Sequence, residues 1–74
     1  MNKPVAGQKY RHFKGCICSI IAIAKDSETL EEMVVYEHDG EIWVRSINMF
    51  MSKVDKEKYP DVEQVYRFEF IEEA

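Results

Sequence analysis

The sequence predicts a small all-β barrel of about five short strands, and three observations support this class. Short runs rich in β-branched and aromatic residues alternate with polar turns. A chain of 74 residues that is 46% hydrophobic can bury one small core. No internal repeat or low-complexity linker divides it. We therefore expect one domain over residues 9–71, a flexible tail over residues 1–8 and an acidic end over residues 72–74.

The first strand is predicted over residues 16–24, which are apolar on both faces. This pattern is typical of a strand covered on both sides, so we place it at the centre of the sheet. Residues 25–32 form a polar connector in which Thr29 and Glu32 have the spacing of a helix capping box. The β-branched run that follows favours a turn instead.

A β-hairpin is predicted around Asp39-Gly40, which lies between two β-branched and aromatic runs. This dipeptide suits both central positions of a type I′ turn. Its two-residue loop pairs Tyr36 with Trp43, and the pairing continues outward along both strands. One face then carries Val34, Tyr36, His38, Glu41, Trp43 and Arg45, which we expect to form a partly wet recognition surface. The opposite face, with Met33, Val35, Ile42 and Val44, is expected to enter the core.

The remaining elements are one helical turn, a loop and a closing strand. The helical turn lies between Ile47 and Met51 and can plug a barrel end, and residues 52–61 form a charged loop. Residues 62–71 alternate well, with Tyr66, Phe68 and Phe70 on one face, so they are expected to close the barrel.

Charge and core size exclude several function classes. The net charge is −4, although the first 14 residues carry four basic side chains and no acidic one. The rest of the chain, from residue 15 onward, is acidic, and this argues against broad nucleic-acid binding, which needs clustered Lys and Arg. A core of this size argues against a deep catalytic cavity. No apolar stretch is long enough for a membrane span, so we expect a cytoplasmic protein with no membrane partner, no cofactor, and a monomeric or weakly dimeric state.

The cysteines are expected to be reduced thiols. Cys16, Cys18, His12 and His38 are the ligand types of a tetrahedral zinc site. In structural zinc sites, however, paired ligand residues are separated by roughly two to four residues on a turn. Cys16-x-Cys18 instead lies in an apolar strand. A Cys–His nucleophile pair is disfavoured because no third orienting group is evident. We therefore predict no metal ligand and no catalytic residue.

Three groups are candidates for binding, and each has a structural alternative. Within residues 10–15, Arg11, His12 and Lys14 can hold a phosphate or carboxylate, whereas Phe13 can simply enter the core. Residues 26–29 can meet a ligand, or Asp26 can cap its own turn. The third group is the face of the hairpin that carries Trp43. Its structural alternative is that barrel twist buries the Trp43 indole in the core beneath Tyr66 or Phe68.

Several motifs resemble the small bacterial family catalogued as domain of unknown function 1653. They are Tyr10-x-His12-Phe13-Lys14-Gly15, Ala24-x-x-Ser27-Glu28-Thr29, Val34-Val35-Tyr36, Trp43-Val44-Arg45, Met49-Phe50 and Val65-x-Arg67-Phe68. Their order and spacing match over about residues 9–71. The resemblance implies an SH3-like barrel and no established activity. It also implies a shared site among the matching polar and amphipathic residues, which are His12, Lys14, Ser27, Glu28, Thr29, Tyr36, Trp43, Arg45 and Arg67.

The sequence also departs from the family pattern. Asp26 stands where the family has a histidine, Ser46 and Tyr66 replace prolines, and the hairpin loop is shortened to residues 37–40. A binding surface built partly from that loop is expected to be altered. Neither cysteine belongs to the pattern.

We therefore expect a binding module with a shallow groove lined by Tyr36, Trp43 and Arg45 and bordered by His12 and Lys14. Its partner is expected to be an extended peptide, a protein or a nucleotide-like anion, since aromatic faces suit stacking and basic groups suit phosphate or carboxylate. One alternative is an enzyme or accessory domain in which His12 acts as acid or base with Glu28. Another is a structural module that associates with itself through exposed strand edges.

Overall fold

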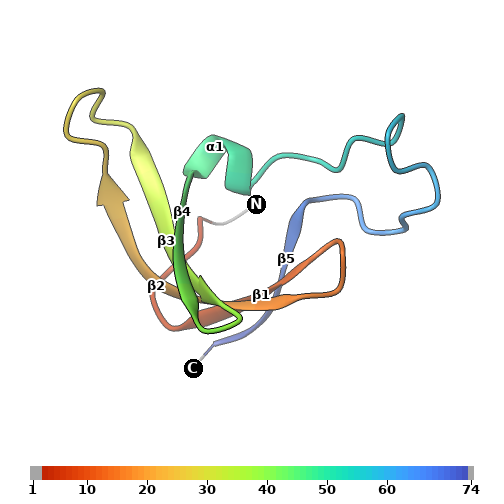
Figure 1. Cartoon of the computed structure of the whole chain (residues 1–74), viewed down its shortest axis with the longest axis horizontal. Coiled ribbons are helices and arrows are strands. Elements are labelled where there is room, and N and C mark those ends of the chain that lie inside the picture. Colours follow the sequence, from red (N-terminus) through yellow and green to blue (C-terminus); the bar gives the residue numbers. More distant parts are fainter. Residues whose placement is uncertain (1–2, 74) are drawn as a thin grey trace.

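The computed structural model describes residues 3–73 and contains an antiparallel sheet of five strands with one short helix (Figure 1). The elements are β1 (Gln8–His12), β2 (Ile17–Lys25), β3 (Glu32–His38), β4 (Glu41–Ser46), α1 (Ile47–Phe50) and β5 (Phe68–Glu73). The strand order is β4-β3-β2-β1-β5, so β2 is central and β4 and β5 are the edges. The all-β class is confirmed, but the curved sheet is open, because its edge strands do not pair to close a barrel.

Two of the predicted strand boundaries are wrong. The polar run around Tyr10 itself forms β1, which begins at Gln8. The last strand begins only at Phe68, because the segment before it bonds to the loop after α1: the Arg67 amide donates to the Ser52 carbonyl at 2.9 Å. β5 then pairs with β1 at an edge of the sheet instead of closing a barrel.

The chain ends also differ from the expected boundaries. Of the tail predicted over residues 1–8, residues 1 and 2 lie outside the described residues. Further along, the Gly7 amide donates to the Ile20 carbonyl at 2.9 Å, which ties this segment to β2. At the other end β5 continues through Glu73, and residue 74 lies outside the described residues. No helix among the described residues is long and apolar enough to span a membrane.

The hairpin has the predicted turn and register. Asp39 and Gly40 have φ values of 54° and 79°, as a type I′ turn requires. Tyr36 pairs with Trp43, and Val34 pairs with Arg45. These pairings place the aromatic and basic side chains of both strands on one face, which we call the inner face.

The assignment of hairpin faces is inverted. Val34 and Tyr36 are 0% and 7% exposed, whereas Ile42 and Val44 are 62% and 60% exposed. The β3 part of the inner face is buried because α1 follows β4 directly and folds back over the sheet (Figure 1). Ile47 and Phe50 join Val34 and Tyr36 in the core, whereas Trp43 of β4 stays 45% exposed. The prediction that β2 is covered on both faces is likewise wrong, since Ile17 and Ile21 are exposed.

Aromatic rings dominate the core on the inner face. Phe50 and Phe68 stack with centroids 4.0 Å apart, and the Tyr10 and Tyr36 rings meet Phe50 edge-on. The predicted helical turn is confirmed, and its cap is Ser46, whose hydroxyl oxygen accepts from the Met49 amide at 3.2 Å. This cap orients α1 so that Phe50 reaches the sheet.

Candidate functional site

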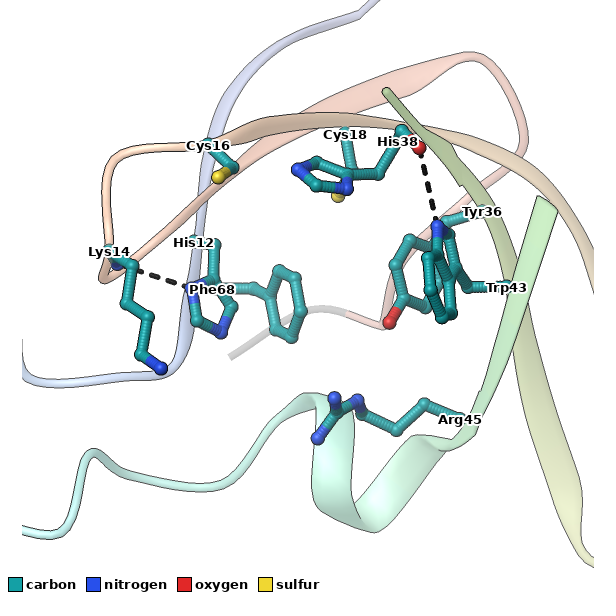
Figure 2. Close-up of a pocket in the computed structure, with 9 residues that line it drawn as sticks. All are labelled: His12, Lys14, Cys16, Cys18, Tyr36, His38, Trp43, Arg45 and Phe68. Atoms are coloured by element: carbon teal, nitrogen blue, oxygen red, sulfur yellow. Dashed lines mark hydrogen bonds between the residues drawn. The ribbon is translucent and has the colours of Figure 1, made fainter. Parts of the chain in front are cut away.

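A cavity of about 240 Å³ opens on the inner face beside the hairpin, and we call it the aromatic pocket (Figure 2). Strands β1 to β5 and the loop between β1 and β2 all contribute to it. Its lining residues are His12, Lys14, Cys16, Cys18, Tyr36, His38, Trp43, Arg45 and Phe68.

The pocket is lined by aromatic rings held in place by the core and the hairpin. Tyr36 and Phe68 are buried, and their rings contact each other at 5.7 Å. Trp43 is 45% exposed, so barrel twist does not bury it. Its indole N–H donates to the His38 carbonyl at 3.2 Å, which orients the ring at the side of the pocket (Figure 2).

Basic side chains converge on these rings. The Arg45 guanidinium lies 5.9 Å from the Phe68 ring centre, and Lys14 and His12 approach the cavity from the opposite side (Figure 2). Among the described residues, no carboxylate lines the aromatic pocket, although the chain as a whole has a net charge of −4. The pocket is therefore locally positive on an acidic protein.

The environment of His12 favours its neutral form. Burial lowers the pKa of His12 most, and the positive charges of Arg45, Lys14 and Arg67 lower it further. Its Nδ1 accepts a hydrogen bond from the Lys14 amide at 3.1 Å, which leaves Nε2 to carry the proton of the neutral ring. An anion bound beside His12 would oppose the effect of the three cations.

A second cavity of about 290 Å³, which we call the cationic pocket, adjoins the first. It shares His12, Lys14 and Arg45 with the aromatic pocket and adds Phe13, Asp55, Lys58, Tyr59 and Arg67. The ammonium groups of Lys14 and Lys58 each lie 5.6 Å from the Tyr59 ring centre. Four basic side chains, Lys14, Arg45, Lys58 and Arg67, therefore line this cavity, together with one carboxylate among the described residues.

The structure brings together six of the nine predicted site residues. His12, Lys14, Tyr36, Trp43 and Arg45 line the aromatic pocket, and Arg67 lines the cationic pocket. Tyr36 contributes as a buried ring and not as the exposed side chain that was predicted. Arg11 of the predicted basic run lines neither pocket, because β-strand alternation points it away from Tyr10 and His12.

The remaining three, Ser27, Glu28 and Thr29, form the turn between β2 and β3 and line neither pocket. The Asp26 carboxylate accepts from the amides of Glu28 and Thr29 at 2.8 and 3.1 Å, so the turn interpretation is confirmed. These amide bonds also hold the pKa of Asp26 below its usual value.

The geometry keeps His12 and Glu28 apart. The His12 amide donates to the Cys16 carbonyl just before β2 begins, whereas Glu28 lies beyond the end of β2 (Figure 1). A strand of nine residues spans roughly 30 Å. The two side chains therefore do not form an acid–base pair in this structure.

The four side chains of zinc-ligand type, Cys16, Cys18, His12 and His38, all line the aromatic pocket. Among the described residues, however, no group of three or more His, Cys, Asp or Glu side chains is placed to hold a metal ion. Burial raises the pKa of the Cys18 thiol to about 11, so it is a neutral thiol near pH 7.

Several lining residues were not predicted as site residues. Phe68 was placed only in the closing strand, and Lys58 and Tyr59 only in a charged loop. They reach the site because β5 pairs with β1 and because Phe13 and Tyr59 contact each other at 4.9 Å. The Tyr59-Pro60 dipeptide is the only local signal at this loop, and it indicates a turn without indicating a contact.

The fold and the two pockets together define a small all-β domain with an aromatic, locally basic cavity. The chain belongs to the family described as protein of unknown function (DUF1653), whose model matches residues 8–70. This match confirms the family resemblance found in the sequence motifs. No curated protein and no solved structure matches the chain in these comparisons. The family description assigns no activity, so function is argued from the site.

Proposed function

We propose that this domain binds a small nucleotide-like anion, one that carries a flat ring, in the aromatic pocket. The observation that carries this proposal is the convergence of Lys14, Arg45 and His12 on aromatic rings, in a cavity lined by no carboxylate of the part of the chain that the structure describes. A ring stacks on the aromatic side chains, and the anionic group meets the cations.

The aromatic lining suits one ring. Ligand pockets for drug-sized molecules occupy roughly 300–1,000 Å³. The aromatic pocket, at about 240 Å³, is smaller than that range, so it suits a single base or a similar ring. Trp43 offers a half-exposed face at the side of the cavity, and stacking of a base on an aromatic side chain is worth about 1–3 kcal/mol.

The basic groups suit a phosphate or carboxylate attached to that ring. The planar guanidinium of Arg45 can form two parallel hydrogen bonds to such a group, and Lys14 adds a point charge. His12, neutral in the free protein, gains a proton more readily when an anion is beside it. The acidic balance of the chain favours a small ligand over a nucleic-acid polymer.

Nucleoside monophosphates are the probes that test this proposal. We expect them to shift the Trp43 indole N–H signal and the backbone amide signals of His12 and Phe68 in a two-dimensional NMR titration of the labelled protein. The two backbone amides report binding by variants that lack the indole. Trp43→Ala and Arg45→Gln should each weaken binding about fivefold or more, because each removes about 1–3 kcal/mol of stacking or charge-assisted bonding. Trp43→Phe should retain most of the affinity.

Lys25→Gln is the matched control, because Lys25 is an exposed cation at the far end of β2 and lines neither pocket. It should bind as the wild type does. Unchanged binding by a folded Trp43→Ala/Arg45→Gln double variant would contradict the proposal.

An extended peptide is the second candidate, and one observation favours it. β4 is an edge strand whose residues Ile42, Trp43 and Val44 are all exposed. Such an edge can accept an additional strand through its backbone groups, with alternate side chains giving specificity. A bound strand would slow hydrogen exchange of the β4 amides, whereas a nucleotide in the aromatic pocket would leave that exchange unchanged.

A further inference from the structure

Binding of a ring with one anionic group leaves Lys58 and Arg67 of the cationic pocket unused. We infer that the two pockets form one bipartite site for a nucleoside di- or triphosphate, with the ring in the aromatic pocket and the phosphate chain in the cationic pocket. This inference rests on the proposed function and specifies its ligand class.

Three shared lining residues place the two cavities next to each other. His12, Lys14 and Arg45 line both of them, so a phosphate held by these groups lies at their common boundary. A chain that continues from that phosphate, away from the ring, enters the cationic pocket. There it meets Lys58 and Arg67, which line only this second cavity.

No cation of the cationic pocket forms an ion pair with another described side chain. Among the side chains that the structure describes, the single ion pair joins Lys3 to Glu32, and neither residue lines this cavity. The Nε of Arg67 is buried and has no hydrogen-bond partner within the described part of the chain. A buried donor without a partner is unfavourable in the free protein, and a ligand oxygen would supply the missing acceptor.

The one acidic group that lines this cavity is already engaged. The Asp55 carboxylate accepts from the amides of Glu57 and Lys58 at 3.0 and 3.4 Å, and so caps its own turn. Around the cavity, this one carboxylate faces four basic side chains, which are Lys14, Arg45, Lys58 and Arg67. This local excess suits several adjacent negative charges better than one, and a phosphate chain supplies them.

The test compares a nucleoside, its monophosphate and its triphosphate in one NMR titration series without divalent cations. The Trp43 indole N–H reports on the aromatic pocket, and the Arg67 Nε–H reports on the cationic pocket. We expect the triphosphate to bind at least about tenfold more tightly than the monophosphate, as one further charge-assisted hydrogen bond would give. It should shift both reporters, whereas the monophosphate should mainly shift Trp43.

Lys58→Gln separates the two pockets. It should weaken triphosphate binding several-fold and leave monophosphate binding unchanged, because Lys58 lines only the cationic pocket. Lys53→Gln is the matched control, since Lys53 is an exposed lysine of the same loop that lines neither pocket. Lys53→Gln should change neither the affinity for the monophosphate nor the affinity for the triphosphate.

The outcomes distinguish this inference from the proposed function. Equal affinities for monophosphate and triphosphate, with no effect of Lys58→Gln, overturn the bipartite site and leave the proposed function standing. No shift at Trp43 with any nucleotide overturns the proposed function and the bipartite site together, even if inorganic triphosphate alone shifts the Arg67 signal.

Discussion

At the scale of single residues, burial decides the chemistry of the side chains in the aromatic pocket. Cys18 is 2% exposed and its pKa is raised to about 11, mainly by burial and further by the charges of Glu37 and Cys16. Cys16 lines the same cavity but is exposed. The folded protein therefore holds Cys18 as a neutral, space-filling thiol, while Cys16 is open to solvent.

The buried thiol predicts a loss of stability at alkaline pH. The thiol ionises near pH 9.0 in the unfolded chain but only near pH 11 in the folded one. Because the folded-state pKa is raised, the stabilisation is complete below pH 9.0 and is lost as pH rises towards 11. Between pH 8 and 10.5, urea unfolding should show the wild type losing about 2 kcal/mol more than Cys18→Ala.

Cys16→Ala provides the comparison, because it removes the exposed thiol of the same cavity and keeps the buried Cys18, so the extra alkaline loss should persist. Parallel profiles for the wild type and Cys18→Ala would show that Cys18 is not held neutral by the fold.

At the scale of elements, the hairpin of β3 and β4 positions the exposed ring of the aromatic pocket. Its type I′ turn sets the register that places Trp43 opposite Tyr36. The turn itself lies outside both pockets. Changes in the turn therefore act on stability, whereas changes in Trp43 act on binding.

Gly40→Ala tests this separation. Gly40 has φ at +79°, and a Cβ there would meet nothing within 4 Å, so the cost is conformational and not steric. We expect a loss of about 1–2 kcal/mol in urea unfolding. Gly40→Asn should lose less, because Asn tolerates positive φ better than Ala does. Equal stability of Gly40→Ala and the wild type would contradict the I′ geometry.

At the scale of the whole molecule, one aromatic cluster supports both the fold and the site. Phe50 is 1% exposed and stacks on Phe68, and Phe68 also lines the aromatic pocket. A domain of this size has a net stability of only a few kcal/mol. The core and the pocket are therefore coupled through shared rings.

Phe50→Ala is expected to unfold the domain. Truncating a buried Phe costs about 3–5 kcal/mol, which is comparable to the total stability of a small domain. Its one-dimensional NMR spectrum should lose the dispersed methyl and amide signals of the folded state. Phe50→Leu, which keeps most of the volume, should stay folded with a lower unfolding midpoint. A Phe50→Ala variant with the unfolding midpoint of the wild type would contradict the role of Phe50 as a core residue.

Local signals in the sequence determined the β-hairpin, its register, the helical turn after it and the membership of the family. These features depend on residues that are close together in the chain: Asp39-Gly40 tolerates positive φ, and the side chain of Ser46 caps the turn that follows it. The Asp26 turn was predicted for the same reason, since a carboxylate bonds to amides two and three residues ahead.

Only the tertiary structure decided which face of the hairpin is buried and which candidate residues share a pocket. Period-two alternation separates two faces but does not say which one a later segment covers, and here α1 covers the face with Tyr36. Arg67 joins His12 because β5 pairs with β1, whereas Ser27, Glu28 and Thr29 lie at the far end of β2. Such proximity depends on long-range strand pairing, which residue type and spacing do not encode.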